Sequence, residues 1–192
     1  MILNINSKEK EMKKALFSSL VASLLASAAF AYGVDGNPEV SFTGYKLANR
    51  TAVVGSFKEV GFKSVENANF TDFLKSFEFS IDPKNINTKL PDRDKRIGII
   101  FDGNVILAKI VSASGDDKAG EIEVEVSVKG NSKAYKTQYT VESGKLKAKI
   151  GIDLLADFKL DETFAKFATA SKAFHGGKSY PDVEISLEAK IK

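Results

Sequence analysis

The chain has 192 residues, no cysteine, and 28 Lys and Arg against 25 Asp and Glu, which gives a formal net charge of +3. The two signs are interleaved along the chain, whereas a nucleic-acid-binding protein usually concentrates its basic residues, so we expect no nucleic-acid partner. The absence of cysteine excludes disulfides, a thiol nucleophile, thiolate metal ligands and the lipidated cysteine of a bacterial lipoprotein.

Residues 1–31 have the pattern of a cleavable signal peptide. Lys13 and Lys14 precede a serine-dotted apolar run, 15–28, and Ala29-Phe30-Ala31 supplies the small residues that a signal peptidase recognises. The polar stretch before Met12 makes Met12 the more natural start. The run is too short and too polar for a good membrane anchor, and we expect no stable membrane insertion. The sequence thus predicts an exported protein whose mature chain, 32–192, is a single domain.

Alternating apolar and polar residues predict strands along most of the mature chain. The alternation is loose at 40–42, 53–57, 60–62 and 77–81. A period of two indicates a strand with one buried face. The first half of the mature chain is therefore expected to be β-structure.

The second half alternates more regularly. GEIEVEVSVKG, Gly120–Gly130, does so without a slip, and 135–141, 145–153 and 182–190 repeat the pattern. Short turns rich in Gly and Asn separate these segments, as in β-hairpins. We therefore interpret 97–153 as an antiparallel meander.

One segment has helical spacing. In 160–174, LDETFAKFATASKAF, Phe164, Phe167 and Ser171 fall on one helical face, with Asp161 placed to cap the start and Gly176 to end the helix. With the strands, this pattern predicts an all-β fold. We expect an extended antiparallel β-barrel of about eight strands with one short helix before the last strand, since consecutive hairpins favour a barrel over a sandwich.

Alternation does not say which way the apolar face points. An outer-membrane barrel would direct it toward lipid. The absence of Trp, the C-terminal Lys192 and the helix near the last strand argue against that alternative. A barrel with its apolar face inward is the preferred interpretation.

The apolar interior is either filled by side chains or holds a ligand, because a barrel of about eight strands allows both. Strands of this length give a channel roughly 20 to 25 Å deep, which suits an extended chain. A filled barrel that serves as a structural or protein-interaction module stays open as an alternative. The residues expected to line a tunnel are Phe42, Phe62, Phe77, Phe79, Ile81, Val124, Val126, Tyr139, Ile150 and Phe167.

The sequence offers little for an enzyme. His175 is the single histidine, no nucleophile-elbow motif is present, and zinc sites need several His or Cys residues at close spacing. We interpret His175 as a turn or surface residue. We expect a protein that is not an enzyme and has no metal and no cofactor.

Several segments, in order, resemble the YceI-like family over nearly the whole mature chain. They are VSFTGYK, VVGSFKEVGF, FEFSIDPKNINTKLPDRDKRI, DLLADFKL and HGGKSYPDVEISLEAKI, and the most specific piece is INTKLPDRDKRI, with Asn-Thr before an Arg-Asp pair. Pro91 departs from the family, in which a polar residue or His is common at this position. The resemblance implies a lipocalin-like barrel whose tunnel takes polyisoprenoid or other long-chain amphiphiles, a periplasmic location, and in several members a homodimer.

These expectations combine into one function. The chain is expected to hold an isoprenoid, an isoprenoid quinone or a fatty-acyl ligand for transport, storage or sequestration. Arg93, with Asn87 and Thr88, could bind a phosphate or carboxylate head group at the tunnel mouth. The interpretation that we prefer for the pair Arg93 and Asp94 is structural, namely fixing the long connection between Ile81 and Ile97.

Overall fold

The computed structural model describes residues 31–192. The expected signal peptide therefore lies outside the described residues, apart from Ala31. The strands are β1 (Glu39–Lys46), β2 (Thr51–Phe57), β3 (Gly61–Lys63), β4 (Glu78–Ile81), β5 (Ile86–Asn87), β6 (Ile106–Gly115), β7 (Ala119–Val128), β8 (Asn131–Glu142), β9 (Lys145–Asp153) and β10 (Asp182–Lys190). The α-helices are α2 (Phe70–Lys75), α3 (Pro91–Gly98) and α4 (Asp161–His175), and η2 (Pro83–Asn85) and η3 (Ile99–Phe101) are 3₁₀ turns.

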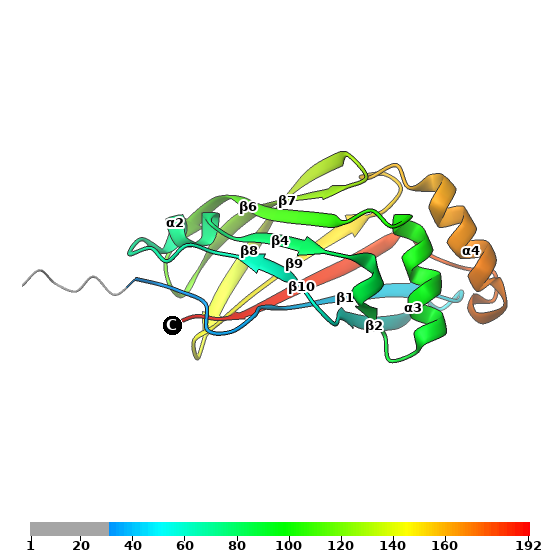
Figure 1. Ribbon diagram of the computed structural model, residues 1–192, viewed down its shortest axis with the longest axis horizontal. Coiled ribbons are helices and arrows are strands. Elements are labelled where there is room, and N and C mark those ends of the chain that lie inside the picture. The colour runs from blue at the N-terminus through cyan, green and yellow to red at the C-terminus, as the bar shows by residue number, and fades with distance from the viewer. Residues whose placement is uncertain (1–30) are drawn as a thin grey trace, which may run out of the picture. The chain divides into compact units, whose positions relative to one another are not determined.

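All ten strands belong to one antiparallel sheet, in the order β3-β4-β6-β7-β8-β9-β10-β1-β2-β5. The sheet curls into a barrel (Figure 1). The face of the sheet that points into the barrel is apolar. This confirms the all-β antiparallel barrel. The strand count exceeds about eight because the sheet ends on two very short edge strands, β3 and β5. The loose alternation at 60–62 falls on β3, whereas the two residues of β5 are too few to alternate.

The connection between β4 and β6 differs from the expected loop and meander. It contains η2, β5, α3 and η3, so the meander begins at Ile106 and not at Ile97. Pro91 stands at the first turn of α3, where its missing N–H is not needed. Asp92 and Asp94 in that turn, with Lys95 and Arg96 in the last, complement the helix dipole.

The helices number more than the one expected. Besides α3, the short helix α2 begins after Asn69, whose side chain accepts a hydrogen bond from the Asp72 N–H. In α4 the capping position is Leu160 rather than Asp161, which is the first helical residue, and Gly176 ends the helix with a φ of 55°. No helix within 31–192 is long and apolar enough to cross a membrane.

The inward and outward faces of the sheet differ sharply. On β7, Ile122, Val126 and Val128 point inward and are buried. The outer face carries cross-strand ion pairs, for example Lys109–Glu125 at 2.9 Å and Lys149–Glu184 at 2.9 Å. The apolar side of the alternation therefore faces the barrel interior.

One end of the barrel is filled by side chains. The helix α2 lies at this end (Figure 1), and its residues Phe73 and Leu74 are 0% exposed, as are Phe77 and Leu146 of the same packed cluster. The rings of Phe73 and Phe77 meet edge to face, 5.0 Å apart. This aromatic cluster forms the closed end, while α3 and α4 lie at the opposite end.

Candidate functional site: an apolar cavity under α4

A cavity occupies the barrel between the filled end and α4. The space open to the centres of water-sized molecules inside it is about 180 Å³, and the whole empty space, with the solvent at the mouth, is about 1550 Å³. Its wall is formed mostly by aliphatic and aromatic side chains, which come from most strands of the sheet and from α3, η3 and α4. Pockets for small ligands are typically concave and mostly apolar, with a few polar groups, and this cavity has that character.

Strand β10 shows where the packing stops. Its inward apolar residues are Val183, Ile185, Leu187 and Ala189, and Ala189 at the filled end is 1% exposed. The other three are only half-buried, although they belong to the same strand and the same face. Their remaining exposed area faces the cavity, so this part of the interior is not filled by the chain itself.

The structure brings together seven of the ten residues expected to line a tunnel. They are Phe42, Phe79, Ile81, Val124, Val126, Ile150 and Phe167, and all lie on the cavity wall.

Phe62, Phe77 and Tyr139 lie elsewhere. The Phe62 and Phe77 rings pack together in the aromatic cluster, 5.1 Å apart, and the Tyr139 hydroxyl donates to the Asp116 main-chain oxygen at 2.7 Å. These three face inward but at the closed end. Alternation identifies the face of a residue, whereas its depth along the barrel depends on strand stagger, which the sequence does not show.

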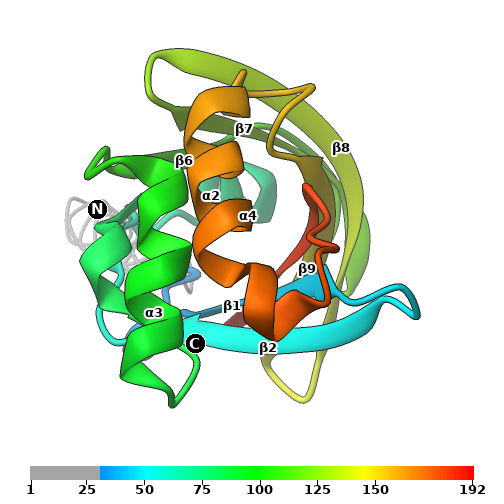
Figure 2. The ribbon, with the colours of Figure 1, turned by 90° about the vertical axis from the view of Figure 1, so that its right-hand side faces the viewer.

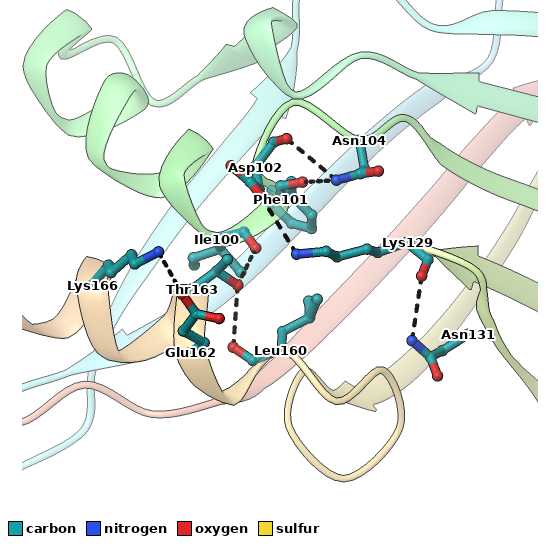
Figure 3. Close-up of polar contacts among 10 residues, drawn as sticks. All are labelled: Ile100, Phe101, Asp102, Asn104, Lys129, Asn131, Leu160, Glu162, Thr163 and Lys166. Carbon is teal, nitrogen blue, oxygen red and sulfur yellow. Dashed lines mark hydrogen bonds and ion pairs between the residues drawn. The ribbon is translucent and has the colours of Figure 1, made fainter.

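Helices α3 and α4 lie across the open end (Figure 2). The start of α4 is fixed to η3 by a buried hydrogen bond in which Thr163 Oγ1 donates to the Ile100 main-chain oxygen at 2.7 Å (Figure 3). Around this contact, Lys129 pairs with Asp102 at 3.5 Å and Lys166 pairs with Glu162 at 2.7 Å. The helix that covers the cavity is therefore tied to the barrel at its N-terminal end.

The three residues expected to bind a head group, Asn87, Thr88 and Arg93, do not all lie on the cavity wall. Arg93 lies on the cavity wall, whereas Asn87 and Thr88 do not. Arg93 Nε donates to Thr88 Oγ1 at 2.8 Å and Nη2 donates to the Thr88 main-chain oxygen at 2.7 Å. Asp94 Oδ1 accepts from the Thr88 N–H at 2.8 Å and from its hydroxyl at 2.5 Å. Arg93 and Asp94 are thus linked by their hydrogen bonds to Thr88. The Asn87 side chain accepts a hydrogen bond from the Lys89 N–H at 3.1 Å.

Two polar residues of the wall were not expected from the sequence. Ser171 and His175 follow Phe167 at intervals of four residues and continue the cavity-facing side of α4. His175 is 8% exposed, which corrects its interpretation as a surface residue. The sequence contains the signal, a helical face extended to the last turn, but polar side chains on such a face are easily taken for its solvent edge.

His175 is held in an electropositive environment. Its Nδ1 and the Ser179 hydroxyl share a hydrogen bond of 2.7 Å, and its ring meets Phe167 edge to face at 5.6 Å. Burial lowers the pKa of His175 below its ordinary 6.5, and the charges of Lys46, Arg96 and Arg93 lower it further. The imidazole is therefore neutral at pH 7, and the surrounding charge is positive.

The described residues contain no group of three or more His, Cys, Asp or Glu that could hold a metal ion. No protein-family model matches the chain, and no curated relative does. Several solved structures are similar, including the two that follow. The crystal structure of Burkholderia cenocepacia BcnA, a YceI-like protein, has a TM-score of 0.55 and 13% identity, covering 83% of this chain and 99% of that one. The Campylobacter jejuni YCEI protein has a TM-score of 0.54 and 16% identity, covering 72% and 83%. The chain therefore has the YceI-like fold.

Proposed function

We propose that this protein is a non-enzymatic binding protein that holds one long-chain amphiphile in the barrel cavity, for transport, storage or sequestration. The observation that carries the proposal is the half-buried inward face of β10, where Val183, Ile185 and Leu187 face open space. A filled interaction module would bury these side chains as completely as Ala189.

Cavity depth and apolar character favour an extended chain. On β7, Ile122 and Val128 both belong to the wall, and the six residue-to-residue steps from one to the other span roughly 20 Å at about 3.3 Å each. Burying a dozen methylenes there would contribute about 10 kcal/mol, at about 0.8 kcal/mol each, before the costs of ordering and association are subtracted. Apolar burial alone is thus large enough to support binding.

The class of the ligand, the location of the protein and its oligomeric state each rest on a different observation. An isoprenoid, a quinone or a fatty-acyl chain would each suit the wall, and the family resemblance suggests a polyisoprenoid or another long-chain amphiphile. The periplasmic location is supported by the signal-peptide pattern of 1–31. A homodimer is suggested by the resemblance alone and stays a prediction.

A pair of neighbouring substitutions on β6 tests the proposal. Ala108 lies on the cavity wall, and Leu107, its neighbour, is 50% exposed on the outer face. Ala108→Phe should abolish uptake of radiolabelled hexadecanol while urea unfolding changes little, because the ring enters empty space. Leu107→Phe, the control, should bind hexadecanol like the wild type.

The alternative predicts a different pattern. If the interior is packed in solution, the wild type takes up no hexadecanol and Ala108→Phe destabilises the fold by about 1 to 3 kcal/mol through overpacking. That result would overturn the proposal in favour of a filled interaction module.

A further inference from the structure

The cavity contains an unsatisfied polar group at its mouth end. Ser171 is 1% exposed and lies on the cavity wall, and its Oγ is the buried side-chain atom of residues 31–192 that has no hydrogen-bond partner. A buried hydroxyl without a partner destabilises the fold, and native structures seldom retain one without a reason. A ligand atom in the cavity would supply the missing partner.

A second open group lies one helical turn further along α4. The hydrogen bond to Ser179 occupies Nδ1 of His175, and Nε2 makes no hydrogen bond within the described part of the chain. Lys46 lies close to His175, because its backbone forms a β-bridge with Ser179, the residue to which His175 is hydrogen-bonded. Ser171, His175 and Lys46 all line the cavity.

The charge at this corner is not balanced by the protein. No ion pair found among residues 31–192 includes Lys46, Arg93 or Arg96. Arg96 instead lies over the Phe174 ring at 4.2 Å. Asp182 pairs with Arg50, and Asp94 reaches Arg93 only through the shared Thr88 hydroxyl, without a direct ion pair. The mouth therefore carries positive charge around a hydroxyl that is free to donate.

From these contacts we infer that the corner formed by Ser171, His175, Lys46 and Arg93 binds a small anionic head group, a carboxylate or a phosphate monoester, on a single-chain amphiphile. The Ser171 hydroxyl donates to the head group, and Lys46 and Arg93 neutralise it. Charge-assisted hydrogen bonds are roughly twice as strong as neutral ones, so an anion gains more here than an alcohol. The inference rests on the proposed function and specifies its ligand.

Three ligands with the same hexadecyl chain test the inference on the full-length protein. Palmitate or hexadecyl phosphate should bind at least about tenfold more tightly than hexadecanol, and the comparison of the two anions shows which head group fits. Equal affinities for all three would overturn the inference and leave the proposed function intact. Failure of all three to bind would overturn the proposed function as well.

Substitutions on α4 identify the donor. Ser171→Ala removes a hydroxyl that bonds nothing in the protein, so it should weaken palmitate binding about tenfold without lowering the melting temperature. Thr169→Ala, on the exposed side of the same helix, is the control and should leave both unchanged. Lys46→Gln should weaken palmitate binding but not hexadecanol binding. A palmitate-to-hexadecanol ratio that stays at the wild-type value in both Ser171→Ala and Lys46→Gln would contradict the assignment.

The single histidine provides an independent readout. In the free protein its environment contains the cations Lys46, Arg93 and Arg96 and the hydroxyls of Ser171 and Ser179. A bound anion offsets those charges, so saturation with palmitate should raise the pKa of His175, measured by NMR titration of its ring protons. An unchanged pKa in the palmitate complex would show that the head group lies elsewhere.

Discussion

Gly55 of β2 lies directly opposite Phe42 of β1, and the Phe42 ring occupies the space that a Cβ at Gly55 would need. The same Cβ would also lie 2.9 Å from the Thr88 Cγ2. Phe42 is part of the cavity wall, so glycine at position 55 sets how far the ring lies back against β2. The shape of the cavity thus depends on a residue that does not itself line it.

Gly55→Ala should therefore lower the free energy of unfolding by about 1 to 3 kcal/mol, because the Phe42 ring must leave its position in a packed wall. Urea unfolding measures the loss. Gly44→Ala on β1 is the control, since a Cβ at Gly44 meets nothing within 4 Å. Equal losses in the two variants would attribute the effect to the strand backbone and not to Phe42.

The hydrogen bond from Thr163 to the Ile100 main-chain oxygen holds α4 over the cavity. Thr163→Val keeps the shape of the side chain but leaves that buried oxygen without its donor, so we expect a loss of about 1 to 3 kcal/mol in unfolding free energy. Thr163→Ser keeps the hydroxyl and should lose less. The account of this anchor fails if Thr163→Ser is as destabilised as Thr163→Val.

Substitutions at Thr88 and Arg93 distinguish the two interpretations of Arg93, namely binding of a head group and fixing of the connection between β4 and β6. Thr88→Val breaks the bonds of its hydroxyl to Arg93 and Asp94 but retains the positive charge, whereas Arg93→Ala removes the positive charge together with the Arg93 bonds to Thr88 and leaves the Thr88–Asp94 bond in place. Both variants should unfold at lower urea concentration, and only Arg93→Ala should weaken palmitate binding. Wild-type palmitate affinity in Arg93→Ala would restrict Arg93 to fixing the connection between β4 and β6.

The lowered pKa of His175 predicts how stability depends on pH. The unfolded chain binds the proton near the ordinary value of 6.5, and the folded protein binds it only at lower pH. The contribution of neutral His175 to the free energy of unfolding is therefore fully present above about pH 6.5. It is lost as the pH falls through the lower pKa of the folded protein. Urea unfolding between about pH 7.5 and about pH 5.5 should show a smaller decline in His175→Gln than in the wild type. An identical decline in both would contradict the pKa direction.

Alternation in the sequence was sufficient to predict the inward faces of β7, β9 and β10, because one buried face imposes a period of two. It did not predict α2, where Phe70, Phe73 and Phe77 precede a short strand and their spacing is easily merged with it. Nor did it separate Tyr139, at the closed end, from Ile150, on the cavity wall.

The polar corner depends on contacts between distant segments. Ser179 brings Lys46 of β1 beside His175 of α4, and Arg93 reaches the wall from α3. No local pattern in the sequence indicates that these segments meet. Of the head-group residues expected from one stretch, 87–93, only Arg93 therefore lies in the corner.

The measurement that tests the central claim most directly is mass spectrometry of an organic extract from the protein purified natively, without detergent, after export in a bacterial host. The account predicts one long-chain amphiphile in stoichiometric amount, whose mass gives its class. A protein that is free of such a molecule, and that also takes up no added hexadecanol, palmitate or isoprenoid, would contradict it and would mean that the cavity under α4 does not serve to hold a chain.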